Sequence, residues 1–178
     1  STVVSRFMAP AWLIISLGVE YQPSDWFSIY LSPATGKFTF VLDDDLSNAG
    51  AYGVTAGKRF RGEFGAFGTL TLNKEIFKNV TINTRLEVFN NYTDPNKENR
   101  VNFDVNWETT INMEVNEWLA VSIFTHLIYD QDIDIGVDTN DDGEFDTFGP
   151  RTQFKEVLGV GVSYKFKKKE KTVEPTEN

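Results

Sequence analysis

The segment 101–115, VNFDVNWETTINMEV, alternates between two kinds of residue along its whole length. Its odd positions are apolar apart from Thr109, and its even positions are polar or charged throughout. Successive side chains of a β-strand point to opposite faces, so this segment predicts a strand with one apolar face and one polar face. Fifteen residues at roughly 3.3 Å each reach about 50 Å, whereas ordinary strands have about 5–6 residues. This combination is typical of a tilted strand in a transmembrane β-barrel, with lipid on one side and a polar lumen on the other.

The same alternation recurs in six further segments of the chain. They are 11–22, 26–42 with interruptions at Pro33 and Gly36, 61–73, 80–92, 118–130 and 151–166. The residues between them are rich in Gly, Pro, Asn and Asp, which favour chain reversals. The sequence therefore predicts an all-β fold, an antiparallel up-and-down meander of about seven long strands.

The connections between these strands alternate in length. Those after the first, third and fifth strands are short, and those after the second, fourth and sixth are longer. Bacterial outer-membrane barrels have short periplasmic turns, longer extracellular loops and an even number of strands. The seventh strand then ends in the periplasm while the first begins outside, so we expect an odd number of further strands to complete the barrel. We expect residues 1–166 to be the C-terminal portion of a larger barrel, followed by a charged, disordered periplasmic tail at 167–178.

Composition and motifs exclude several classes of function. The chain has no cysteine, so neither a disulfide framework nor a thiolate metal site can form. Its net charge of −9 argues against nucleic-acid binding. No apolar run is long enough for a transmembrane helix. We find no catalytic triad, metal-ligand cluster or phosphate-binding loop, and we therefore predict that the protein is not an enzyme.

The long acidic connection 131–150 contains one motif with metal-binding spacing. Asp138, Asn140, Asp142 and Asp146 stand at positions 1, 3, 5 and 9, with Gly143 at position 6, as in the first part of an EF-hand loop. Position 12 is Gly149, where that pattern requires a bidentate Glu. The motif predicts at most a short or weak calcium site, and an acidic surface loop without a ligand is the alternative interpretation.

The polar faces of the predicted strands carry charges of both signs, which we expect to fill the lumen as cross-strand ion pairs. A selective ion path is the alternative. The charged residues concerned are Glu20, Glu63, Arg85, Glu87, Asp104, Glu108, Glu114, Lys155 and Lys165. His126 points to the same side, and we expect its ring to be hydrogen-bonded there without a catalytic role.

Aromatic residues gather near the short turns and the end of the last strand. Tyr21, Trp26, Trp118 and Tyr164 would form an aromatic girdle at the periplasmic side of the membrane. Glu156 is on the apolar face of the last strand, ten residues before Phe166. Because a membrane strand needs only about 9–11 residues, we expect Glu156 to lie at the outer rim.

Several phrases of the sequence resemble a Bacteroidota outer-membrane family that is labelled only as a domain of unknown function. They are SRFMAPAW (5–12), SPATGKFTFV (32–41), NAGAYGV (48–54), FNNY (89–92), VNWETTINM (105–113), LIYDQDI (127–133) and GPRTQFKEVLGVGVSYKF (149–166). The resemblance implies a location in the bacterial outer membrane and further strands upstream, about twelve in the complete barrel. It implies no activity.

Three functions fit these expectations. The first is an integral outer-membrane barrel that serves as a structural or accessory component of an envelope complex. The second is a diffusion channel or transporter, and the third is a soluble lipid-binding β-barrel. The partners implied by the first two are outer-membrane lipid and the strands, of the same protein or another chain, that complete the barrel.

Overall fold

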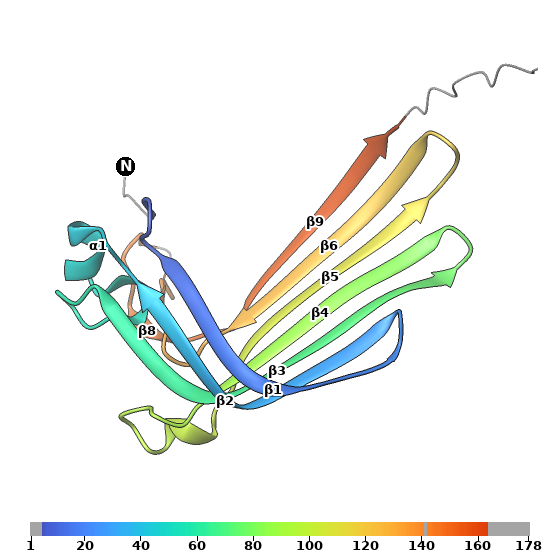
Figure 1. Ribbon diagram of the computed structural model, residues 1–178. Coiled ribbons are helices and arrows are strands. Elements are labelled where there is room, and N and C mark those ends of the chain that lie inside the picture. Colours follow the sequence, from blue (N-terminus) through green and yellow to red (C-terminus); the bar gives the residue numbers. More distant parts are fainter. Residues whose placement is uncertain (1–4, 141, 164–178) are drawn as a thin grey trace, which may run out of the picture.

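The main sheet contains seven strands that follow one another in chain order (Figure 1). The computed structural model describes residues 5–140 and 142–163. Every neighbouring pair of strands is antiparallel. In spatial order the strands are β1 (Ala11–Ser24), β2 (Phe27–Phe40), β3 (Phe60–Phe77), β4 (Val80–Asn91), β5 (Asp104–Glu114), β6 (Leu119–Tyr129) and β9 (Gln153–Val162). The predicted all-β meander is confirmed.

The strands differ from the prediction most clearly at three places. β5 begins at Asp104 rather than at residue 101, because Asn99–Val101 forms a short 3₁₀-helix, η2. β3 continues to Phe77, so the predicted turn 74–79 shortens to two residues, with Asn79 at a φ of 65°. β2 runs through Pro33 without a break, because a register shift between Ser32 and Thr35 accommodates the ring in a bulge.

The long connections contain ordered elements that the sequence did not predict. The acidic connection 131–150 includes a two-stranded hairpin of β7 (Asp134–Val137) and β8 (Thr147–Pro150). The connection after β2 includes the helix α1 (Asp44–Asn48) and the 3₁₀-helix η1 (Ala51–Gly53). Asp43 caps α1 by accepting a hydrogen bond from the Leu46 amide at 3.1 Å.

Long connections and short turns lie at opposite ends of the sheet (Figure 1). Because the order is antiparallel throughout, β1 and β9 both run from the long-connection end to the short-turn end. Each of these two strands pairs with one neighbour only, β1 with β2 and β9 with β6. Two edges of the sheet are therefore left without a partner strand in the described chain.

Cross-strand register gives the sheet two chemically distinct faces. One row crosses the whole sheet with apolar residues, and the adjacent row is mainly polar. The first comprises Tyr21, Ile29, Leu70, Leu86, Trp107, Leu127 and Phe154. The second comprises Glu20, Tyr30, Thr69, Glu87, Asn106, Ile128 and Gln153. We call the first side the outward face and the second the inward face.

The buried apolar core is small and lies outside the sheet. Its members are Ala9, Val41, Leu46 and Val54, packed with Ala51 and Tyr52 at the long-connection end. Phe89 is the one further buried apolar side chain among the described residues. The apolar residues of the outward face are exposed or half-buried instead, and the most exposed include Leu17 (78 %) and Leu158 (70 %) on the edge strands and Leu31 (57 %) within the sheet. Among the described residues, no helix is long and apolar enough to cross a membrane.

Candidate functional site

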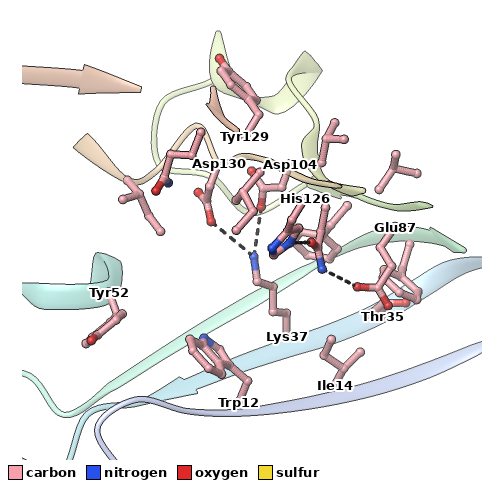
Figure 2. Close-up of a pocket in the computed structure, with 18 residues that line it drawn as sticks. Trp12, Ile14, Thr35, Lys37, Tyr52, Glu87, Asp104, His126, Tyr129 and Asp130 are labelled. Atoms are coloured by element: carbon pink, nitrogen blue, oxygen red, sulfur yellow. Dashed lines mark hydrogen bonds and ion pairs between the residues drawn. The ribbon is translucent and has the colours of Figure 1, made fainter. Parts of the chain in front are cut away.

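A hollow of about 530 Å³ opens on the inward face near the long-connection end. Its lining includes Trp12 and Ile14 from β1 and Gln153 from β9, as well as residues of the strands between them. Since both edge strands contribute to one hollow, the sheet curls around its inward face. Figure 2 shows Trp12 and Tyr52 on one side of this hollow and Asp104, Asp130 and Tyr129 on the other.

Lys37 is at the centre of the hollow (Figure 2). Side chains of β2 alternate between the two faces, so Lys37 points inward while Phe38 and Phe40 point outward. The rings of Phe38 and Phe40 pack on Phe60, with centroid distances of 5.9 and 5.3 Å. The Lys37 ammonium lies 3.0 Å from a carboxylate oxygen of Asp104 and 3.9 Å from one of Asp130. It also lies 5.0 Å from the centre of the Phe89 ring, a cation–π distance.

Arg61 extends the cluster toward the loop that follows β6. Its guanidinium donates to Glu63 at 2.8 Å and forms an ion pair with Asp132. Glu63 stands opposite Lys37 in the register and lies 4.0 Å from its ammonium. We call these six residues the inward charge cluster: Lys37, Arg61, Glu63, Asp104, Asp130 and Asp132.

The inward charge cluster is largely shielded from solvent. The exposed fractions of its side chains run from 3 % for Glu63 to 20 % for Asp132. Two cations face four carboxylates, so the cluster has a formal charge of −2. Burial raises the pKa of the Asp132 carboxyl from its ordinary value, although the adjacent Arg61 guanidinium lowers it. The cluster ties β2, β3, β5 and the loop after β6 together, and its excess negative charge favours cations in the hollow.

Some of the charges predicted for the lumen form the expected cross-strand ion pairs, and others do not. Glu63 and Asp104 pair with Lys37, a residue that the sequence analysis did not select. Arg85 pairs at 2.6 Å with Glu87 on its own strand rather than across to a neighbour. Lys165 lies outside the described residues. Lys37 was missed because the second strand was expected to be interrupted, and the alternation of Lys37 with Phe38 was the signal that could have found it.

His126 is hydrogen-bonded on the inward face, as expected. Its Nε2 lies 2.6 Å from the side-chain oxygen of Asn106 and 3.6 Å from a Glu108 carboxylate oxygen. Asn106 in turn donates to Glu87 at 3.0 Å. The His126 ring is therefore part of a polar network across three strands.

The predicted calcium residues lie in one exposed loop between β7 and β8. The Asp138 carboxylate accepts hydrogen bonds from the backbone amides of Asn140, Asp142 and Gly143. Gly143 has a φ of 89°, the left-handed turn that a glycine permits at this position. The described residues contain no group of three or more acidic, His or Cys side chains arranged to hold a metal ion. Calcium binding therefore stays a prediction from the spacing.

Asp146 takes a separate role in the same loop. Its carboxylate accepts hydrogen bonds from the Thr139 hydroxyl at 2.6 Å and from the Thr139 backbone amide at 2.7 Å. These two hydrogen bonds lower the pKa of Asp146. A bound calcium ion would have to compete with them for this carboxylate.

Replacing Asp142 by alanine is expected to abolish any calcium binding by the loop, because it removes an oxygen ligand from position 5 of the motif. Calorimetric titration of the protein with calcium and with magnesium measures this directly. Asp134→Ala, in the neighbouring β7, is the matched control and should leave the heat unchanged. Absence of calcium-dependent heat at millimolar concentration would remove the motif as a site.

Three of the four predicted girdle aromatics stand at the short-turn end of the sheet. Trp26 follows β1, Trp118 precedes β6, and Tyr21 is near the end of β1; all three are exposed. The Lys74 ammonium covers the Trp26 ring at 4.0 Å. Tyr164 lies outside the described residues, as does the predicted tail at 167–178.

Comparison of the chain with protein-family models, with curated proteins and with solved structures finds no match.

Proposed function

We propose that this chain forms seven strands of an integral outer-membrane β-barrel that serves as a structural or accessory component of the cell envelope. The observation that carries the proposal is the uncovered apolar outward face. It extends over all seven strands, and no second layer of the described chain packs on it. In water such a surface would be far larger than the few hundred Å² that monomeric proteins expose. In a bilayer it is the expected outer wall of a barrel.

The direction of the two edge strands supports an incomplete barrel. Lipid offers no hydrogen bonds to open strand edges, so β1 and β9 both require partner strands. β1 and β9 are parallel to each other, because both run toward the short-turn end. If a second copy in the same orientation closed the barrel, β1 of one copy would pair with β9 of the other as parallel strands. An antiparallel closing element must therefore contain an odd number of strands, from the same protein or from another chain.

The distribution of polarity distinguishes membrane and soluble alternatives. A soluble lipid-binding barrel keeps its apolar side chains inside and its charges outside. Here Lys37, Glu87, Asp104 and Asp130 line the hollow beside aromatic and aliphatic side chains, and an apolar row of residues faces outward across the whole sheet. The phrases that resemble a Bacteroidota outer-membrane family agree with the membrane assignment.

A diffusion channel or transporter is the second candidate, and the inward hollow with its excess of carboxylates favours it. Against a wide pore, the inward charge cluster links three strands and a loop beside that hollow, and Lys37, Asp104 and Asp130 line it. Planar-bilayer recordings of the complete protein distinguish the two functions. We expect no steady conductance for the structural role, and cation-selective steps would support the channel.

Membrane integration itself is tested by fractionation of the complete protein expressed in a bacterium. We expect it in the outer-membrane fraction, resistant to carbonate and high-salt extraction and released by detergent. Recovery in the soluble fraction without detergent would contradict the proposal and favour the lipid-binding alternative.

A further inference from the structure

The outward face of the seven-stranded sheet contains a single carboxylate among its described residues. Register assigns Glu156 to this face, between Phe154 and Leu158 on β9. The other acidic residues of these strands, such as Glu75, Glu87 and Glu108, alternate to the inward face. Glu156 is exposed and makes no hydrogen bond or ion pair with any described residue.

A polar row leads across the outward face to this carboxylate. Thr84, Thr109, Thr125 and Glu156 are register neighbours on β4, β5, β6 and β9. Thr109 is at the centre of β5, whereas Glu156 is the fourth of the ten residues of β9, toward the long-connection end. At the β4 end of the row, the threonine hydroxyls have hydrogen-bond partners. Thr84 shares a hydrogen bond with Thr109 at 2.7 Å and accepts one from the Trp107 ring nitrogen at 2.8 Å. At its β9 end the row stops at an unpaired charge on an open strand edge.

We propose that the strand which pairs with β9 places a lysine or arginine beside Glu156 on the outward face. This inference rests on the proposed membrane barrel. An unpaired carboxylate on an apolar, lipid-facing surface carries a desolvation cost, which an adjacent cation offsets. Cross-strand neighbours have Cβ atoms about 4.5–5.5 Å apart, close enough for this contact. The interaction surface is the outward half of β9: Phe154, Glu156, Leu158, Val160 and Val162.

The partner strand has defined chemistry. It runs antiparallel to β9, and therefore from the short-turn end to the long-connection end. It carries apolar residues opposite Phe154, Leu158 and Val160, which are 62–70 % exposed in the described chain. Its one basic outward residue fixes the register, because a slip by one residue would turn the cation inward.

The unfolding rate of the complete protein in lipid vesicles tests the inference. Replacing Glu156 by leucine removes a charge from an apolar face, and would leave stability unchanged or improved if no cation were present. With the cation in place, Glu156→Leu leaves it unpaired, and we expect unfolding to be faster by about tenfold or more. Thr125→Leu, in the same row on β6, is the matched control and should change the rate little.

Charge reversal provides the second arm. Glu156→Lys should unfold faster than Glu156→Leu. Replacing one basic residue of the strand bonded to β9 by glutamate in the Glu156→Lys variant should restore the original unfolding rate. Should Glu156→Leu fail to fold, Glu156→Gln takes its place, and we expect its unfolding to be faster by about tenfold or more as well. A neutral or stabilising Glu156→Leu, with no suppressor of Glu156→Lys on the paired strand, would overturn the inference. Failure of membrane integration, in contrast, would appear in the fractionation of the unmodified protein.

Discussion

Ile111→Arg is expected to destabilise the protein in a bilayer by about 2–4 kcal/mol, the cost of an arginine on the lipid face near the midplane of a β-barrel. Ile111 is on the outward face of β5, opposite Ile82 on one side and Ile123 on the other. Its neighbours therefore provide no carboxylate to pair with the new charge. Val105→Arg, on the same face, should also be costly, with a smaller effect if it lies nearer the membrane surface.

Asn112→Arg is the matched control for this substitution. Asn112 is the next residue on β5, faces inward and is exposed. An arginine there remains in a polar lumen, and we expect a change of less than about 1 kcal/mol. Denaturant unfolding in lipid vesicles, followed by tryptophan fluorescence, measures both variants. Equal costs at positions 111 and 112 would contradict a lipid-facing outward surface.

Lys37→Met is expected to cost about 3–5 kcal/mol, the typical effect of removing one partner from a buried ion-pair network. The substitution keeps most of the volume of the side chain but leaves Asp104, Asp130 and Glu63 without their shared cation. The Lys37 side chain is only 19 % exposed, so water cannot replace the lost charge effectively. Asp104 would be affected most, because it loses the 3.0 Å hydrogen bond from the Lys37 ammonium, whereas Glu63 keeps the Arg61 guanidinium at 2.8 Å.

Arg85→Met is the appropriate comparison for Lys37. Arg85 is also an inward-facing cation, but its side chain is 59 % exposed and its ion pair is with Glu87 alone. Exposed ion pairs contribute about 0–1 kcal/mol, so this variant should be nearly neutral. Adding Asp104→Asn to Lys37→Met should recover part of the lost stability, because it removes one uncompensated charge. If Lys37→Met and Arg85→Met had the same effect, the inward charge cluster would have no structural role.

Strand alternation made most of the sheet predictable. Each strand of the main sheet is long, and its apolar residues recur at every second position, so a local pattern defines both the element and its two faces. The hairpin of β7 and β8 was missed because each strand has only four residues, in a segment dominated by Asp and Gly. Pro33 was misleading for a different reason. Whether a proline ends a strand or sits in a bulge depends on the neighbouring strand, which the local sequence does not show.

The inward charge cluster was harder to predict because its contacts are distant in sequence. Lys37 and Asp104 are 67 residues apart, and Arg61 and Asp132 are 71 residues apart. Alternation assigned Glu63 and Asp104 to the inward face, but it gave no information on which cations would reach them. Asp130 and Asp132 lie beyond the end of β6, where alternation no longer applies.

The pairing of β1 and β9 in the complete protein, determined by structure analysis in lipid nanodiscs, tests the proposed incomplete barrel most directly. We expect each of these strands to be hydrogen-bonded to a further strand that runs antiparallel to it, with the outward face in contact with lipid. The strands added between β9 and β1 should be odd in number. A closed seven-stranded barrel with β1 bonded to β9, or a second protein layer over the outward face, would contradict the membrane-barrel proposal.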